Sequence, residues 1–316
     1  MRTLLRWAGW LLVVLSIVLA GWVAWVNLVS IPATETLSVA DGPGTLVEVD
    51  GTRLHVRTWG PDDGEPIVLV PGFGPPGLEL FEDLAAELAA DGRRVVGVDL
   101  VGFGWSERPT EAGPRLTVRG RADLLERVAA EWGLGAVDLL GHSYGGGVAA
   151  QWALEAPDRV DELVLVDAQV YDGGGGVGRL LGGLPLGIGR AVSFTVIGAG
   201  PVASALYGLE CDVGGACPTE EQLEAWSRPA LVAGTSTGLV AISRTEPDSD
   251  LPDGLPAAPT LVVWGANDTI FPLEQGERLA AELADGRLAV VEDAAHTPFL
   301  THPADVAELV LGHTSD

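Results

Sequence analysis

Short apolar runs recur along most of the chain, separated by longer segments of helical period. The runs, rich in valine and leucine, lie at residues 67–70, 95–100, 137–140, 163–166, 261–264 and 288–291. Several lack polar alternation, which is typical of parallel strands buried on both faces. The segments between them predict helices at residues 78–90, 117–132, 144–155, 273–283 and 304–311. This alternation predicts one mainly parallel, doubly wound α/β sheet.

Two other segments extend this pattern. Residues 45–49 and 52–58 alternate on either side of Asp50-Gly51, which predicts a β-hairpin. From about residue 168 to 258 no strand pattern occurs, and a structureless loop of that length is uncommon in a compact domain. We therefore expect a core formed by residues 45–168 and 258–316, interrupted by a mostly helical lid at residues 169–257.

The N-terminus has a different composition. Arg2 and Arg6 precede an uncharged stretch that continues to Ile31, long enough to cross a hydrocarbon core of about 30 Å. Tryptophans near both of its ends are typical of interfacial anchors. We expect residues 1–31 to be an uncleaved transmembrane helix, residues 32–44 a linker, and the catalytic domain to lie outside the cytoplasm. The alternative is a cleaved secretory signal, since Val18 and Ala20 satisfy a small-residue cleavage rule.

The uncharged part of the predicted lid also bears on the membrane. Residues 191–209 carry no charge and are rich in glycine, alanine and valine. A second membrane span there would place the two halves of the predicted core on opposite sides of the bilayer. We therefore interpret this stretch as an apolar lid that covers the active site and can touch the membrane.

Charge and composition exclude several kinds of chemistry. The 316 residues carry a formal charge of −26, and all 18 basic residues are arginine. Without lysine the chain has no Schiff-base or P-loop lysine, so pyridoxal-phosphate enzymes and P-loop nucleotidases are excluded. So acidic a protein repels nucleic acid and polyanions, which favours a small, neutral, hydrophobic substrate. Cys211 and Cys217 either form a small disulfide loop or remain thiols.

One motif carries most of the chemical information. The run 137–140 leads directly into Gly141-His142-Ser143-Tyr144-Gly145, which a helical segment follows. This G-x-S-x-G pattern between strand and helix is a nucleophile elbow, in which a sharp turn exposes the serine hydroxyl. On these residues the chain resembles the α/β-hydrolase fold family over about residues 45–168 and 258–313. The resemblance implies a chain order of serine, then acid, then histidine.

Both remaining triad members have candidates in that order. The loop after run 261–264 contains Asp268, and the loop after run 288–291 contains His296. Asp167 is a competing acid, because a carboxylate after the preceding strand serves in some family members. His302, six residues after His296, is the competing base, and we expect it to be a capping or packing residue. The resemblance therefore implies Ser143 as nucleophile, His296 as general base and Asp268 as its partner.

The resemblance also implies an oxyanion hole. Pro71-Gly72-Phe73-Gly74 follows the first parallel strand, so the backbone N–H groups of Phe73 and Tyr144 are expected to bind the oxyanion. Pro71 stands where the family usually has histidine, which puts the conformation of this loop in doubt. Asp99 is expected to hold the loops around the elbow. No cofactor and no metal ion are expected.

The expected activity is hydrolysis of a neutral hydrophobic ester, in the manner of an esterase or lipase, through an acyl-enzyme. The same triad also serves amidases, carbon–carbon bond hydrolases and cofactor-free peroxidases, and the fold alone does not choose among them. Family members that use aspartate at the elbow, dehalogenases and epoxide hydrolases, are excluded by Ser143. The alternative from a different functional class is a membrane-tethered binding protein that keeps the fold but has no catalytic activity.

Overall fold

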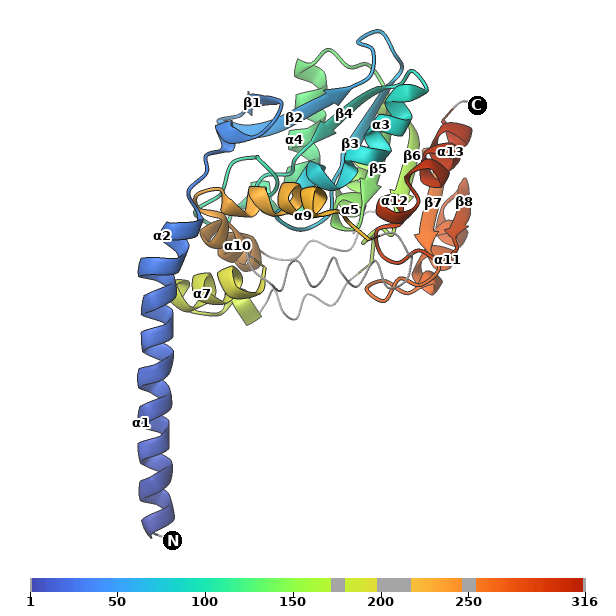
Figure 1. Cartoon of the computed structure of the whole chain (residues 1–316). Helices are drawn as coiled ribbons and strands as arrows, with labels where there is room; N and C mark the ends of the chain where they lie inside the picture. Colours follow the sequence, from blue (N-terminus) through green and yellow to red (C-terminus); the bar gives the residue numbers. More distant parts are fainter. Residues whose placement is uncertain (1, 172–179, 198–216, 246–253, 315–316) are drawn as a thin grey trace.

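The computed structural model describes residues 2–171, 180–197, 217–245 and 254–314, and its centre is one eight-stranded sheet (Figure 1). The strand order is β1-β2-β4-β3-β5-β6-β7-β8. β1 and β2 form the predicted hairpin and pair antiparallel with each other, and β2 pairs antiparallel with β4, whereas every later pairing is parallel. The strands are β1 Thr45–Val49, β2 Thr52–Trp59, β3 Pro66–Val70, β4 Arg94–Val98, β5 Val137–His142, β6 Val160–Val166, β7 Thr260–Gly265 and β8 Gly286–Val291.

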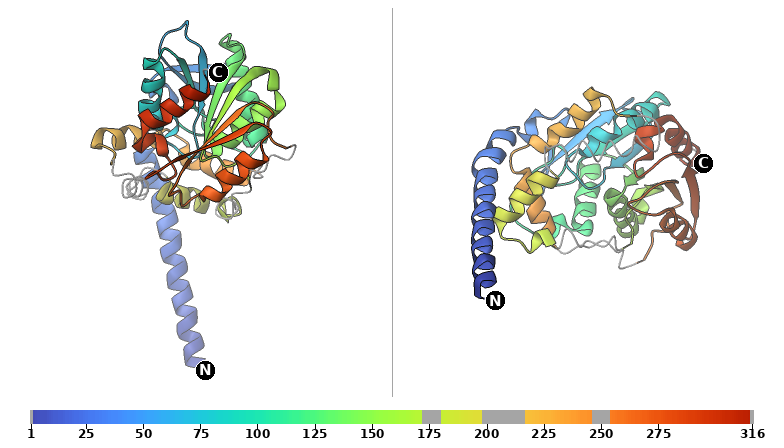
Figure 2. Two further views of the ribbon diagram at one scale, coloured as in Figure 1. Left: turned by 90° about the vertical axis from the view of Figure 1, so that its right-hand side faces the viewer. Right: turned by 60° about the horizontal axis from the view of Figure 1, so that its bottom comes forward.

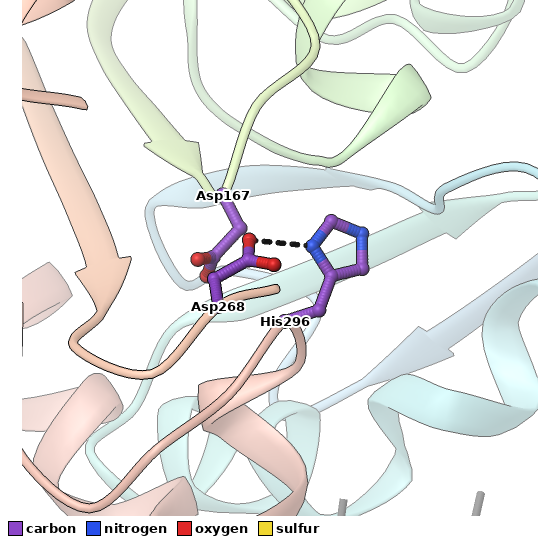
Figure 3. Close-up of side chains that lie close together, drawn as sticks. All are labelled: Asp167, Asp268 and His296. Atoms are coloured by element: carbon purple, nitrogen blue, oxygen red, sulfur yellow. Dashed lines mark hydrogen bonds and ion pairs between the residues drawn. The ribbon is translucent and has the colours of Figure 1, made fainter. Parts of the chain in front are cut away.

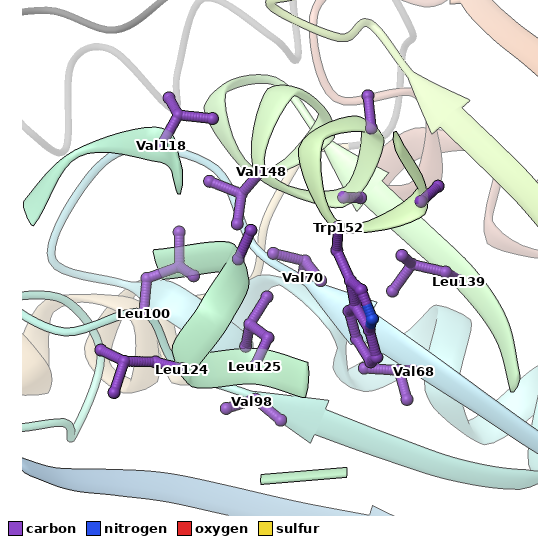
Figure 4. Close-up of a cluster of buried hydrophobic side chains, with 14 of the residues drawn as sticks. Val68, Val70, Val98, Leu100, Val118, Leu124, Leu125, Leu139, Val148 and Trp152 are labelled. Carbon is purple, nitrogen blue, oxygen red and sulfur yellow. The ribbon is translucent and has the colours of Figure 1, made fainter. Parts of the chain in front are cut away.

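Helices cover both faces of this sheet. Both faces need cover because the side chains of each strand alternate between them and are apolar on both. In β3, Val68 and Val70 pack on one face, while Ile67 and Leu69 pack on the other. The first face is covered by α4 Val118–Glu131, α5 Tyr144–Glu155 and α11 Leu273–Glu282, and the second by α3 Glu82–Ala90, α12 Pro298–Thr301 and α13 Pro303–His313. Figure 4 shows the first of these two apolar layers, where Trp152 of α5 lies over the sheet. The predicted doubly wound α/β-hydrolase sheet is confirmed.

The largest local difference from the sequence prediction concerns residues 78–90. Only Glu82–Ala90 is α-helical, because Gly77–Phe81 forms a 3₁₀-helix first. The Asp99 carboxylate accepts the Leu78 N–H at 2.8 Å, and a side chain on Gly77 would clash with that carboxylate. This buried acceptor holds the tighter turn in place. The short helix α12 was not predicted.

The described residues between β6 and β7 contain α7 Leu186–Val196, α9 Glu220–Ser227, the 3₁₀-helix Arg228–Leu231 and α10 Thr235–Arg244. Arg108 joins this insertion to the core. Its buried guanidinium donates to Thr235 Oγ1 and the Pro229 carbonyl in the insertion, and to the carbonyls of Phe103, Gly104 and Ser106 in the core. The exact limits of the insertion stay a prediction. Cys217 is in a disulfide, whereas Cys211 lies outside the described residues.

An extended helical segment leaves the domain at the N-terminus. It consists of α1 Arg2–Trp25, a π-helical turn Val26–Ser30 and α2 Ile31–Thr34, and residues Arg6–Thr34 are long and apolar enough to cross a membrane. Its far end points away from the domain, as Figures 1 and 2 show. Residues 32–44, which we predicted to be a linker, contain all of α2 except Ile31 and the whole 3₁₀-helix Val39–Asp41. They also contact the insertion. The chain therefore has one candidate membrane span or signal sequence among its described residues.

Asp99 lies at the centre of the loops that precede the elbow, in agreement with its expected structural role. It is fully buried and accepts hydrogen bonds from the N–H groups of Leu78 and Trp105, and it pairs with His55 Nδ1 at 2.8 Å. His55 also bonds through Nε2 to the carbonyl of Pro43. One buried carboxylate thus joins β2, the 3₁₀-helix after β3 and the loop after β4.

The His55–Asp99 pair makes stability depend on pH. Burial alone would lower the pKa of His55, but the hydrogen bond and charge of Asp99 outweigh it and raise that pKa above 6.5. The contribution of the pair is therefore complete below pH 6.5 and is lost as pH rises through the folded-state pKa. We expect His55→Gln to lower the urea midpoint most in mildly acidic buffer. A difference from wild type that grows toward alkaline pH would contradict this.

Candidate active site

The elbow places Ser143 in a backbone conformation that serine rarely adopts. Ser143 lies between β5 and α5 with φ 52° and ψ −125°, outside the allowed regions for most residues. Neighbouring backbone leaves no room for side chains: a Cβ on Gly141 would lie 2.5 Å from the Gly145 carbonyl oxygen, and one on Gly145 2.3 Å from that of Pro71. The glycines of the motif are therefore required by close packing of strand, helix and loop.

Three side chains that are distant in sequence meet at this turn. His296 Nε2 lies 2.9 Å from Ser143 Oγ, and His296 Nδ1 lies 2.8 Å from Asp268 Oδ2. All three side chains are buried. Figure 3 shows the imidazole directed at the Asp268 carboxylate. Asp268 as acceptor holds the proton on Nδ1, so Nε2 faces the serine hydroxyl as an acceptor and can remove its proton.

Backbone groups of the loop that follows β7 hold the second oxygen of the Asp268 carboxylate. Its Oδ1 accepts the N–H groups of Ile270 and Phe271 at 2.7 and 3.0 Å, which leaves Oδ2 for the histidine. Burial alone would raise the pKa of Asp268, but the hydrogen bond and charge of His296, followed by these two N–H groups, lower it below its ordinary value. The carboxylate therefore stays ionised at neutral pH and can stabilise an imidazolium.

Asp167, the competing acid, lies beside the triad. It is fully buried at the end of β6 with φ 43°, and its Oδ1 accepts the Gly265 N–H at 3.0 Å. One ligand atom from each of Asp167, Asp268 and His296 lies within 4.8 Å of the others, so these residues are also the place where a metal ion would fit. Both nitrogens of His296 already face partners, however. This geometry favours a triad with a second carboxylate nearby.

His302, His313 and His55 have partners other than Ser143. His302 joins α12 to α13, and its Nδ1 lies 2.8 Å from the hydroxyl of Thr301. His302 is the N-cap residue of α13, although its side chain makes no capping hydrogen bond, and it does not contact Ser143. His313 pairs with Glu162 at 3.1 Å, and His55 lies in the Asp99 network. Of the histidines, His296 is the one whose ring contacts the serine hydroxyl.

The predicted oxyanion loop lies against the serine. A Cβ built on Gly72 would be 3.1 Å from the Cβ of Ser143, so this loop passes directly beside the candidate nucleophile. The ring of Phe73 meets those of Phe103 and Tyr144 edge to face, with centroids 4.8 and 6.4 Å apart. Phe73 and Tyr144 therefore flank Ser143. The role of their backbone N–H groups stays a prediction.

His142 has a part in the site that sequence reasoning did not assign. Its Nε2 donates to the backbone carbonyl of His296 at 2.9 Å. Phe299 meets the ring edge to face at 4.9 Å. Burial, followed by the charge of His296, lowers the pKa of His142 to about 3, so the ring stays neutral. The elbow thus positions both Ser143, the candidate nucleophile, and the backbone of His296, the candidate base. The sequence signal for this contact is the histidine that directly precedes the serine.

We expect His142→Leu to slow covalent modification of Ser143 by a fluorophosphonate about tenfold, because the loss of a buried hydrogen bond frees the His296 loop. His142→Gln is the matched control, since its amide nitrogen can replace Nε2 as donor, and we expect it to recover most of the rate. The measurement is the second-order labelling rate as a function of pH. Equal rates for the two variants would contradict a positioning role for this ring.

Comparison with known proteins agrees with this geometry. Residues 65–303 match the model of a family described as alpha/beta hydrolase fold. A 2-hydroxy-6-oxononadienedioate/2-hydroxy-6-oxononatrienedioate hydrolase of Klebsiella pneumoniae is 28% identical over 295 residues, covering 87% of this chain and 93% of the relative.

Solved structures give the same result. An esterase from Exiguobacterium antarcticum is 26% identical, with TM-score 0.66 over 86% of this chain and 100% of that one. A bacterial membrane phospholipase A shares the fold at 23% identity, with TM-score 0.65 over 100% of this chain and 98% of the other. With its elbow, its sheet order and a family match across most of its length, the chain belongs to the alpha/beta hydrolase fold family.

Proposed function

We propose that this hydrolase cleaves a neutral, hydrophobic carboxylic ester through a covalent acyl-enzyme on Ser143. The observation that carries the proposal is the continuous contact from Ser143 Oγ to His296 Nε2 and from His296 Nδ1 to Asp268. A binding protein that merely kept the fold would have no need of a strained, buried serine held against a histidine.

The reaction takes place in two steps. Ser143 Oγ attacks the ester carbonyl while His296 Nε2 takes the hydroxyl proton, and the oxyanion lies between the N–H groups of Phe73 and Tyr144. As the tetrahedral intermediate collapses, His296 returns the proton to the leaving alcohol. Water then attacks the acyl-enzyme, His296 takes and returns one proton, and the carboxylic acid leaves. Asp268 stabilises the imidazolium in both steps.

Covalent labelling tests this assignment. We expect wild-type protein to react with a fluorophosphonate and Ser143→Ala to give no adduct in intact-mass measurement. Labelling of Ser143→Ala at the wild-type rate would refute the assignment of the nucleophile.

The two neighbouring carboxylates supply a matched pair of variants. Asp268→Asn should lower kcat for ester cleavage by roughly 10⁴-fold, because the imidazole loses the acceptor that fixes its tautomer. Asp167→Asn replaces a second buried acid, whose Oδ1 accepts the Gly265 N–H rather than contacting His296, and we expect a much smaller loss. If Asp167→Asn were the more damaging change, the roles of the two acids would have to be exchanged.

Carbon–carbon bond hydrolysis is the second candidate, and the relative from Klebsiella pneumoniae favours it. The substrate named for that relative is a dioate, which carries two carboxylates at neutral pH. This chain has a formal charge of −26, which opposes the approach of a dianion. The same charge does not affect a neutral ester, and for this reason we place ester cleavage first.

A direct comparison of substrates separates these candidates. We expect kcat/KM for p-nitrophenyl esters to rise from acetate to decanoate by about fourfold for each methylene that is buried. We expect 2-hydroxy-6-oxononadienedioate to be cleaved far more slowly than the best ester. The opposite order, with dioate cleavage lost in Ser143→Ala, would assign the chain to carbon–carbon bond hydrolases.

We further propose that the N-terminal helix remains attached as a membrane anchor and that the catalytic domain lies outside the cytoplasm. The side chains of the span are nearly all exposed, unlike those of a core helix. Arg2 and Arg6 lie at its far end, and positive charge flanking a span favours the cytoplasmic side.

A further inference from the structure

The last turns of the N-terminal helix are packed against the insertion. Val26 and Ile31 are buried together with Ala191 of α7, and Trp22, Val23 and Phe194 pack around them. Asn27, a polar residue within the apolar helix, donates from Nδ2 to the carbonyl of Gly187 at 2.8 Å. The anchor therefore holds α7 by apolar burial and by a hydrogen bond.

The segment that follows the anchor contacts a second helix of the insertion. The Glu35 carboxylate accepts the N–H groups of Gly234 and Ser236 at 3.0 and 2.9 Å, and also the Ser236 hydroxyl. A carboxylate at this end of α10 satisfies open N–H groups and complements the helix dipole. Leu37 pairs with the backbone on both sides of Val232. Two helices of the insertion are thus attached to residues 22–37.

α10 also contacts the core beside the candidate active site. Leu239 and Ala241 belong to the buried cluster that includes Phe103, and Tyr144 packs against this cluster. Phe103 in turn meets Phe73, the first residue of the predicted oxyanion pair. The insertion is therefore joined to the anchor on one side and to the apolar cluster beside the residues that flank Ser143 on the other.

The length of the N-terminal helix determines how deep in the bilayer its contacts with α7 would lie. A span of about 30 Å needs about 20 residues, so a crossing that begins after Arg6 ends near Val26. With the membrane anchor proposed above, the residues that contact α7 would lie at the membrane–water interface, and α7 would lie there with them. On α7, Leu186 and Val196 keep 44% and 46% of their surface exposed. Figure 1 shows α7 beside the anchor, between the sheet and the free end of α1.

We propose that α7 lies in the interfacial layer of the bilayer and that the enzyme takes its acyl ester from the membrane rather than from bulk water. This inference rests on the proposed ester hydrolysis and names the substrate class: amphiphilic acyl esters dissolved in the bilayer. Since the chain carries 44 acidic residues and no lysine, the contact is apolar and does not require anionic lipid.

The location of α7 can be measured without catalysis. The full chain, with a solvent-sensitive fluorophore on Leu186→Cys, is placed in phosphatidylcholine vesicles that contain a spin-labelled lipid as quencher. We expect strong quenching at this position and none for the same probe on Val290→Cys, an exposed residue of β8. Equal quenching, or none, at the two positions would overturn the proposal.

A pair of substrates with the same leaving group tests the route of entry. 4-Methylumbelliferyl oleate is dissolved in phosphatidylcholine vesicles that carry the enzyme, and 4-methylumbelliferyl butyrate is supplied in solution. Asn27→Leu should lower turnover of the oleate about fivefold, as expected for loss of one hydrogen bond, and leave the butyrate rate nearly unchanged. Ser16→Ala, an exposed change on the same helix, should affect neither.

The outcomes distinguish the two proposals. Butyrate cleavage that Ser143→Ala abolishes, without oleate cleavage by wild type, would leave the hydrolase in place and refute entry from the membrane. An equal effect of Asn27→Leu on both substrates, or no effect on either, would also refute it, because the anchor contact would then have no specific role for membrane substrate. Failure to cleave either ester would refute the proposed ester hydrolysis itself.

Discussion

The strained backbone of Ser143 is the constraint on which the rest of the site depends. A serine with positive φ persists only where its surroundings hold it, and three backbone hydrogen bonds do so here. Its N–H donates to the Val166 carbonyl, and its own carbonyl accepts from Gly146 and Gln169. The same bonds fix the end of β6 and the start of the insertion. Much of the local architecture thus follows from the need to expose one hydroxyl at a sharp turn.

Parallel pairing explains why residues so far apart in sequence meet. β5, β6 and β7 are adjacent in the sheet, and their carboxyl ends lie at one edge. Ser143 follows β5, Asp167 follows β6 and Asp268 comes shortly after β7, so each loop delivers a side chain to the same place. His296 comes from the loop after β8, the edge strand. The neighbouring carboxylates of Asp167 and Asp268 result from this order.

The sequence allowed most of the sheet and the position of Ser143 to be predicted, because both depend on local signals, whereas Asp268 and His296 were expected from the chain order that the family resemblance implies. Buried parallel strands need uninterrupted apolar runs, and the elbow needs glycines around Ser143. The hydrogen bond from His142 to the His296 carbonyl could not be predicted, since it depends on two loops meeting in space. Proline, threonine and serine after Ile31 indicated a linker, although Glu35 there caps α10. The composition of a segment indicates its local flexibility, but it cannot predict a contact with residues that are distant in sequence.

The packed segment between anchor and domain has a consequence for the kinetics of the enzyme. A flexible linker of the length of residues 32–44 would let the domain drift by about 20 Å from its attachment point. Glu35 and Leu37 remove that freedom, so in the proposed membrane-anchored enzyme the fold would determine the height and tilt of the catalytic domain above the bilayer. If the substrate is dissolved in that membrane, as we propose, turnover would scale with the number of substrate molecules per unit area of membrane, and dilution of the vesicles would leave the rate per enzyme unchanged.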